Sequence, residues 1–349
     1  MTFKSRINSF RRKLTQSITK NIGNSYSEPK KGDLEIEAIK NVLIIRPNHR
    51  LGNQLLLTPI VQEVLNTFPN CTVDLFVKGG VAHPVFENYD RVDRIIKLPR
   101  KPFNNLFKYA KSWISVKNKK YDLVINGDKN SSSGRLLTQQ AKAKFKIFGE
   151  VTEEIQNKYP DYRHISKYPV YNLRYYLQKL GLDYNSKDLP VLDIKLNEAE
   201  ITGGKKILDD LVKNDKKTIC IYTNATGDKC YSEEWWVTFY QRLLKEYPDY
   251  NVIEMLPIEN ISKINFKAPN FYSKDIREMG AVLRNTAVFI AADNGVMHLA
   301  SASLVPTVGF FSVTKEEVYG PYGRNGSFAL NTNKTDIDAW FEAIKVILP

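Results

Sequence analysis

The sequence of 349 residues lacks a long apolar run: no stretch approaches the roughly 20 residues that a membrane-spanning helix needs. Its first residues also lack the apolar core of a secretory signal, because Arg6, Arg11, Arg12 and Lys13 interrupt them. We therefore expect a cytoplasmic protein. With 42% hydrophobic residues, the chain is long enough to form two domains, each with its own core.

Cysteine and histidine are scarce. The three cysteines, Cys71, Cys220 and Cys230, are too few and too scattered for a disulfide framework or a zinc site. The four histidines form no HxxxH pair, so we expect no metal site. No GxGxxG motif follows either of the predicted first strands, which argues against a dinucleotide-dependent oxidoreductase.

The formal net charge of +13 indicates an anionic partner, which is nucleic acid, lipid or a phosphorylated substrate. No DNA- or RNA-binding motif accompanies the charge, so nucleic acid is the least favoured. Residues 1–31 are strongly basic, with Glu28 as their single acid. We expect segment 1–33 to be either a basic amphipathic helix on an anionic membrane surface or a disordered basic tail. The apolar residues that recur at helical spacing are Phe3, Ile7, Phe10, Leu14 and Ile18.

Two runs of alternating strands and helices follow this tail. Such alternation predicts an α/β protein with two parallel, doubly wound, Rossmann-like sheets, each covered on both faces. The first run predicts strands at Val42–Ile45, Thr72–Val77, Val92–Leu98 and Tyr121–Ile125, with a helix at about 104–117. The second predicts strands at Thr218–Tyr222, Tyr250–Met255, Ala287–Ala291 and Pro306–Phe311, with helices between them and at Ile337–Leu348.

These runs predict an N-terminal domain at 34–175, an inter-domain segment at 176–214 and a C-terminal domain at 215–349. We expect the two domains to face a common cleft, because ligands of doubly wound sheets bind beyond the carboxyl ends of the strands.

The strongest local signal joins a strand directly to a helix at Asp293-Asn294-Gly295. The first amides of such a helix have no partner within the helix and carry the positive end of its dipole, so a diphosphate is a suitable ligand. Gly295 would let that ligand approach the backbone, and His298 lies one turn further on. The alternative is an ordinary connection in which Asp293 and Asn294 cap the helix.

Two other loops leave the first strand of each run. The loop Thr223–Ser232 offers the hydroxyls of Thr223 and Thr226 and the charge of Lys229, which could neutralise a leaving diphosphate. Its alternative is a plain surface loop.

The loop Arg46–Gln54 follows the first strand of the N-terminal run. Gly52 there permits close approach of a ligand. Its alternative is a turn with the arginines in solvent. The polar side chains of this loop that we expect at the cleft are Arg46, His49, Arg50 and Asn53.

Together these segments resemble glycosyltransferase family 9, the bacterial lipopolysaccharide heptosyltransferases, over about residues 40–349. The resemblance implies a GT-B fold and an inverting, metal-independent glycosyltransferase without a further cofactor. The implied donor is a nucleotide sugar, typically ADP-heptose, and the implied acceptor is a lipopolysaccharide core or another lipid-linked saccharide at the inner face of the bacterial inner membrane. It rests on Leu51-Gly52-Asn53, Leu57-Thr58-Pro59, Tyr121 to Ile125, Lys229 before Glu234-Trp235, Asp293 to Ala300, Pro306-Thr307-Val308 and Tyr319-Gly320-Pro321.

Position by position, the resemblance places the donor contacts in the C-terminal domain, 215–349, and assigns the acceptor to the N-terminal domain, 34–175. It assigns the diphosphate to Thr226 and Lys229, the sugar and phosphates to Asp293, Asn294, Gly295 and His298, and the nucleoside to Glu259.

The sequence departs from this family at Asn53 and, more mildly, at Asn294, where threonine is usual. Asn53 replaces the aspartate proposed to deprotonate the acceptor hydroxyl, and an amide cannot accept that proton. General-base assistance commonly contributes a factor of about 10²–10⁴. Our hypothesis is that His49 or Asp128 takes the role, or that Asn53 only orients the acceptor. Asp128 could equally bind the acceptor sugar or its phosphate, together with Ser131, Ser132, Ser133 and Arg135.

A second function stays open because of Asn53. The chain would then be a catalytically weak or inactive relative that binds a nucleotide sugar or a glycolipid.

Overall fold

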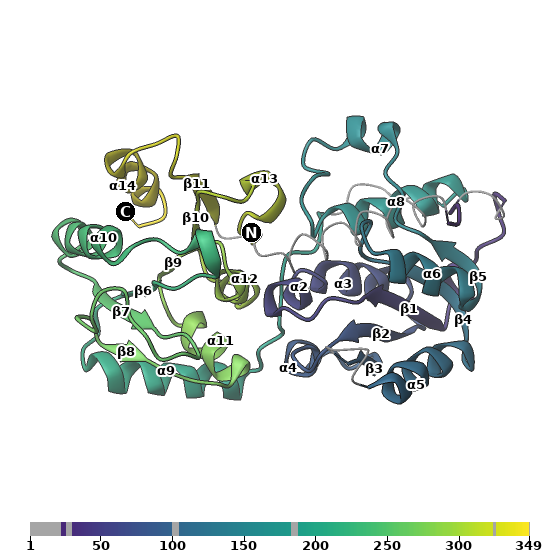
Figure 1. Cartoon of the computed structure of the whole chain (residues 1–349), viewed down its shortest axis with the longest axis horizontal. Helices are drawn as coiled ribbons and strands as arrows, with labels where there is room; N and C mark the ends of the chain where they lie inside the picture. Colours follow the sequence, from purple (N-terminus) through teal and green to yellow (C-terminus); the bar gives the residue numbers. More distant parts are fainter. Residues whose placement is uncertain (1–21, 26–29, 100–104, 183–187, 324–325, 349) are drawn as a thin grey trace. The chain divides into compact units, whose positions relative to one another are not determined.

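The computed structural model describes residues 22–25, 30–99, 105–182, 188–323 and 326–348. The predicted apolar stripe from Phe3 to Ile18 lies outside the described residues. The chain divides into two compact units (Figure 1). The first comprises Met1–His49, Pro59–His83 and Tyr89–Pro190, and the second comprises Arg50–Thr58, Pro84–Asn88 and Val191–Pro349.

The first unit is built on a parallel sheet of five strands in the order β3-β2-β1-β4-β5 (Figure 1). Its central strands are rich in Val, Ile and Leu and almost wholly buried, as a parallel sheet with helices on both faces requires. The strands are β1 (Asn41–Arg46), β2 (Thr72–Lys78), β3 (Val92–Leu98), β4 (Lys120–Asn126) and β5 (Lys142–Ile147). The helices are η1 (Ile36–Ala38), α3 (Thr58–Thr67), α5 (Leu106–Lys117), α6 (Ser132–Gln140), α7 (Glu153–Lys158) and α8 (Tyr168–Lys179). The residues of α4 (Ala82–Phe86) are divided between the two units.

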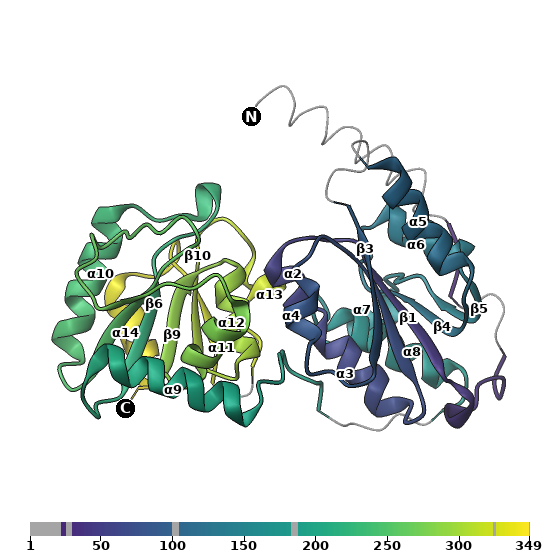
Figure 2. The ribbon, with the colours of Figure 1, turned by 90° about the horizontal axis from the view of Figure 1, so that it is seen from below.

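Helices cover both faces of this first sheet. Figure 2 shows α5 and α6 on one side and α3 and α8 on the other. Val116 of α5 and Leu137 of α6 share one hydrophobic core with Leu43 and Ile45 of β1. Burial of these side chains is the main force that holds the two helices to the sheet.

The second unit is built on a parallel sheet of six strands in the order β11-β10-β9-β6-β7-β8. The strands are β6 (Thr218–Tyr222), β7 (Asn251–Met255), β8 (Asn270–Phe271), β9 (Val288–Ala292), β10 (Thr307–Phe311) and β11 (Phe328–Asn331). The helices are α2 (Leu51–Leu55), α9 (Glu198–Val212), η3 (Gly227–Lys229), α10 (Glu233–Glu246), α11 (Ile276–Arg284), α12 (Gly295–Ala302), α13 (Glu316–Tyr319) and α14 (Ile337–Lys345).

An aromatic core fixes α10 and α14 to this second sheet. Trp236 and Phe239 of α10 meet Phe310 of β10 and Phe341 of α14, and all four side chains are buried. Ser232 caps α10, since its hydroxyl accepts a hydrogen bond from the backbone N–H of Trp235. Figure 2 shows α11 and α12 on the other side of β6 and β9.

Helices α9 and α11 approach each other very closely at Gly204. A Cβ atom added to Gly204 would overlap the backbone carbonyl of Ala281 and lie 2.7 Å from the backbone nitrogen of Val282. The side-chain amide of Asn285, just after α11, donates to the carbonyl oxygen of Ile201 in α9 over 2.9 Å. Only glycine at position 204 permits this contact between the two backbones.

The predicted strands and helices are confirmed to within a few residues at their ends. Three strands were not predicted, namely β5, β8 and β11. Within the predicted loop Arg46–Gln54, the short helix α2 begins at Leu51, so that loop prediction was wrong. Five residues are too few for a helical pattern in the sequence, and packing on α12 holds α2 in place.

Candidate active site

The proposed donor residues gather where β6 and β9, which pair directly, reach their carboxyl ends. Lys229 follows β6 through η3, and Asp293 follows β9. The ammonium nitrogen of Lys229 lies 3.1 Å from the Oδ2 atom of Asp293. The same oxygen accepts a hydrogen bond of 2.6 Å from the hydroxyl of Thr314. The Asp293 side chain is 7% exposed and that of Lys229 is 23% exposed, so a buried carboxylate holds a cation at the surface.

Asn294 caps α12 more fully than expected. Its Oδ1 atom accepts hydrogen bonds of 2.8 Å from the backbone N–H groups of Val296 and Met297. Its side-chain amide donates to the carbonyl oxygens of Asn224 and Ala292. The expectation that the first-turn amides are open to a ligand was therefore wrong for two of them. Asn294, rather than Asp293, is the cap, and it also ties α12 to the loop after β6.

Gly295 faces a helix and not an open space. A Cβ atom added to Gly295 would lie 3.3 Å from the backbone nitrogen of Gly52 and 3.4 Å from the Cβ atom of Leu51. A Cβ atom added to Gly52 would lie 2.8 Å from the Cδ2 atom of His298, which is buried. The two glycines therefore let α2 and α12 meet at their backbones. Leu51-Gly52-Asn53 and the first turn of α12 form one packed element inside the second unit.

Thr223 takes part in a buried network behind the loop. Its hydroxyl donates to the Oε1 atom of Glu254 over 2.6 Å and accepts from the backbone N–H of Lys263. The hydroxyl of Ser262 donates to the other carboxylate oxygen of Glu254 over 2.6 Å. Burial raises the pKa of Glu254, and both hydroxyls oppose that shift. Because its hydroxyl is engaged in this way, we assign Thr223 to bracing the loop.

Thr226 and Glu259 are exposed on the second unit. Thr226 directly precedes η3, which carries Lys229. Glu259 lies in the loop after β7, where its charge adds to the effect of burial in raising the pKa of Tyr222. Ile258 and Ile261 are also exposed in this loop, so the rim near Glu259 offers apolar surface beside a carboxylate.

Two supporting residues were missed at the level of sequence. Glu254 could have been noticed as a charged residue within the otherwise apolar end of β7. Thr314 carries no comparable signal, because it lies in a polar stretch after β10 and meets Asp293 only in the fold.

The two interpretations of its loop place Arg46 either at the cleft or in solvent. Both were wrong for this residue. It is 1% exposed, and its Nη1 atom donates to the carbonyl oxygen of Gly127 over 3.3 Å. The hydroxyl of Tyr168 donates to the same carbonyl and accepts from the backbone N–H of Lys129. Arg46 therefore fastens the end of β1 to the end of β4.

The family model for glycosyltransferase family 9 (heptosyltransferase) matches residues 109–339, which is more than half of the chain. The chain belongs to glycosyltransferase family 9. This confirms the resemblance seen in the sequence and shows that the protein is a glycosyltransferase of a heptosyltransferase-like family. A search of the curated proteins gives no match.

Solved structures of family 9 enzymes share the fold. A family 9 glycosyltransferase from Veillonella parvula is 15% identical, with 90% of each chain covered and a TM-score of 0.66. E. coli heptosyltransferase WaaC with ADP is 16% identical over 88% of this chain and 99% of its own, with a TM-score of 0.63. E. coli ADP-heptose lipopolysaccharide heptosyltransferase II is 13% identical over 88% and 98%, with a TM-score of 0.62. The predicted GT-B fold is thereby confirmed.

The two candidates for the base of this family 9 chain, His49 and Asp128, and the candidate for orienting the acceptor, Asn53, differ in their surroundings. Asn53 is half-buried on α2, in the second unit. His49 is exposed in the first unit. Asp128, half-buried after β4, accepts a hydrogen bond of 3.0 Å from the backbone N–H of Asn130. Ser131, next to it, caps α6, so Ser132 to Arg135 lie in a helix and not in a polar loop.

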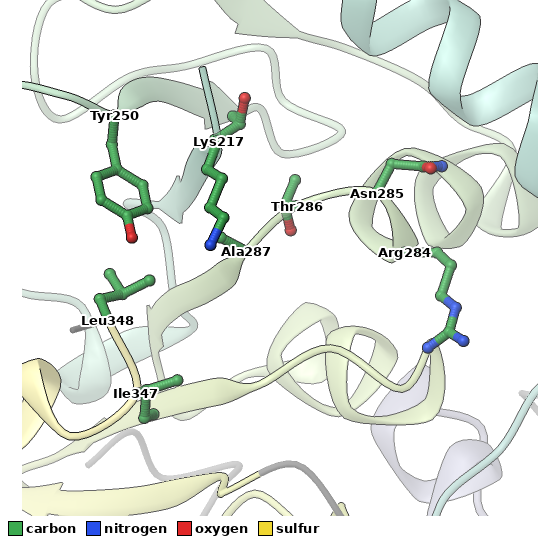
Figure 3. A pocket seen from close by; sticks show the side chains of 9 residues that line it. Lys217, Tyr250, Arg284, Asn285, Thr286, Ala287, Ile347 and Leu348 are labelled. Carbon is green, nitrogen blue, oxygen red and sulfur yellow. The ribbon is translucent and has the colours of Figure 1, made fainter. Parts of the chain in front are cut away.

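A pocket of about 330 Å³ lies at the end of the second sheet away from Lys229 and Asp293 (Figure 3). Lys217, which precedes β6, and Ala287, which precedes β9, line it together with Tyr250, Arg284 and Leu348. The pocket is thus at the amino ends of these strands. Since ligands of doubly wound sheets bind at the carboxyl ends, we do not assign the family 9 donor to it.

Two further observations concern only the described part of this family 9 chain. Its His, Cys, Asp and Glu side chains form no group of three that could hold a metal ion. None of its helices is both long and apolar enough to cross a membrane.

Proposed function

We propose that this family 9 chain is an inverting, metal-independent heptosyltransferase. It would move heptose or a related sugar from a nucleotide sugar, ADP-heptose first of all, to a lipopolysaccharide core or another lipid-linked saccharide. The pair of Lys229 and Asp293 at the carboxyl ends of β6 and β9 is the observation that carries this proposal. The similarity to E. coli heptosyltransferase WaaC with ADP and to E. coli ADP-heptose lipopolysaccharide heptosyltransferase II supports the choice of donor.

Lys229 is suited to stabilise the leaving diphosphate. An ammonium group has three N–H donors, and Asp293 takes one of them. Negative charge grows on the diphosphate as its bond to the sugar breaks, and a cation already held in place stabilises that charge without reorganising. We propose that the exposed hydroxyl of Thr226 adds a hydrogen bond, that Glu259 faces the nucleoside, and that Asp293 and the backbone at Asn294 and Gly295 hold the sugar and phosphates.

The transfer itself joins the acceptor oxygen to the anomeric carbon while the bond from that carbon to the diphosphate breaks. The acceptor proton needs a base. Asp128 supplies an ionisable carboxylate and His49 an imidazole, and either could take the proton. Asn53 offers an amide that orients the acceptor hydroxyl. An oxocarbenium-like transition state lowers the need for a strong base, so the amide at position 53 is compatible with turnover.

The place of action that we propose is the cytoplasm, at the inner face of the inner membrane. A lipid-linked acceptor lies there, and the basic tail within residues 1–33 would be attracted to anionic lipid. That tail falls largely outside the described residues.

The proposal is tested by the release of ADP from ADP-heptose, with and without a lipopolysaccharide-core acceptor, for the parent chain and for Asn53→Asp. We expect release by the parent to depend on the acceptor. Asn53→Asp should raise acceptor-dependent release by no more than about tenfold, since an amide that orients the acceptor already supplies part of the effect of a base, commonly 10²–10⁴ in all.

A second function, a weak or inactive relative that binds a nucleotide sugar or glycolipid, is favoured by the amide at position 53. It predicts no acceptor-dependent release by the parent and a large gain in Asn53→Asp. That outcome would replace the heptosyltransferase proposal.

A further inference from the structure

Helix α5 has one face built for the core of the first unit. Val116 is buried, and Tyr109 and Trp113 are half-buried against the same hydrophobic core. The Trp113 ring meets the ring of Phe76 edge-on at 6.3 Å between centroids. The hydroxyl of Ser112 donates to the carbonyl oxygen of Lys97 at the edge strand β3. These contacts fix which face of α5 looks outward.

The outward face of α5 is apolar along its middle. Phe107 is 94% exposed, Leu106 is 62% exposed and Ile114 is 54% exposed. Phe107, Ala110 and Ile114 follow one another at spacings of three and four residues, so they form one stripe along the helix. Most exposed apolar side chains stand singly and need no explanation, but a stripe on one helix marks an interaction surface.

The charged side chains of α5 itself all have one sign. Lys108, Lys111 and Lys117 of α5 are exposed beside it, and Lys97 and Lys120 are exposed on the strands next to α5. The sequence from Arg94 to Tyr121 contains no Asp or Glu. We call Leu106, Phe107, Lys108, Ala110, Lys111, Ile114 and Lys117 the α5 face.

We propose that the α5 face docks onto an anionic lipid bilayer. A helix with an apolar stripe and a basic surround lies in the interface, with its apolar side chains among the acyl chains and its lysines at the headgroups. Charge complementarity favours this partner over a second copy of the chain or the chain's own tail. Residues 1–31 carry eight basic residues and one acid, so the tail is repelled by the α5 face. Figure 2 shows α5 on the outside of the first unit.

This surface acts independently of glycosyl transfer. Vesicle binding needs neither donor nor acceptor, so a failure of the proposed function would leave the lipid-binding result unchanged, and the reverse also holds.

The test uses the full chain and sedimentation with vesicles of phosphatidylcholine, either alone or mixed with phosphatidylglycerol. We expect binding to the mixed vesicles only. Phe107→Ser/Ile114→Ser should weaken that binding at least tenfold, because both side chains leave water when the helix docks. Lys111→Glu/Lys117→Glu should also weaken it at least tenfold, since each lysine near an anionic surface is worth about a factor of five.

A matched control is Val346→Ser, which changes an apolar side chain that is 84% exposed in the second unit. It should leave vesicle binding unchanged. All variants should have the melting temperature of the parent, because the substituted side chains are exposed. The same α5 substitutions, made in a chain lacking residues 1–31, separate the contribution of the α5 face to vesicle binding from that of the tail. If Phe107→Ser/Ile114→Ser binds as the parent does in both backgrounds, or changes only the oligomeric state, the proposal is overturned.

Discussion

Replacing Lys229 by alanine is expected to lower the turnover number for glycosyl transfer by about 10²–10³. That is the usual cost of removing one preorganised group that stabilises charge in the transition state. The expectation rests on the ammonium group, which Asp293 holds 3.1 Å away at the surface of the second unit. Steady-state kinetics over a range of donor concentrations measure it, and the effect should fall mainly on kcat, because the charge on the diphosphate grows as the bond breaks.

A control for charge is Lys216→Ala. Lys216 is exposed, and its ammonium group donates only to the carbonyl oxygen of Pro248 among the described contacts. This variant should keep the parent turnover.

A second control addresses the carboxylate that Lys229→Ala leaves behind. Asp293 is nearly buried, and an unpaired buried charge destabilises a fold. The double variant Lys229→Ala/Asp293→Asn removes that charge. It should melt close to the parent and still turn over slowly. Recovery of turnover in the double variant would contradict the role of Lys229 at the diphosphate.

Gly204→Ala is expected to destabilise the second unit by about 3 kcal/mol, the upper end of the usual cost of overpacking. The new methyl group would meet the backbone of Ala281, which cannot turn aside as a side chain can. Helices α9 and α11 would have to separate.

The neighbouring residue is the matched control. Gly203 lies in the same helix, is exposed, and has no atom within 4 Å of an added Cβ. Gly203→Ala should therefore stabilise the chain by about 0.5–1 kcal/mol, because alanine loses less backbone entropy in a helix than glycine does. Thermal and urea unfolding of the two variants measure the difference. A shift of the same sign in both would contradict the close approach of α9 and α11.

Much of this fold could be predicted because its strands are short runs of Val, Ile and Leu separated by amphipathic helices. The missed strands lacked that signal. In β5, lysines alternate with other residues, and only Phe145 and Ile147 are buried. β8 has two residues, and all four residues of β11 are half-buried. Pairing with neighbouring strands, rather than local pattern, makes these segments strands.

The candidate site was predictable in its residues but not in its contacts. A strand that ends at Asp293 and a loop that carries Lys229 are visible in the sequence, yet their pairing requires β6 and β9 to lie side by side. The contact of Gly52 with Gly295 joins segments more than 200 residues apart. From the local sequence alone, a glycine is interpreted as part of a turn or as a place where a ligand approaches the backbone. Here the packing of α2 on α12 gives the reason instead.

The central claim is that Lys229, held by Asp293, binds the donor diphosphate. Its most direct test is the binding of nucleotide sugars. The melting temperature of the parent chain and of Lys229→Ala is measured with ADP-, UDP-, GDP- and CMP-sugars. A ligand at about 100 times its Kd should stabilise the fold by about 2.7 kcal/mol. We expect ADP-heptose to raise the melting temperature of the parent, and to do so less in Lys229→Ala. The absence of a shift with all four classes, or an equal shift in both proteins, would contradict the donor site.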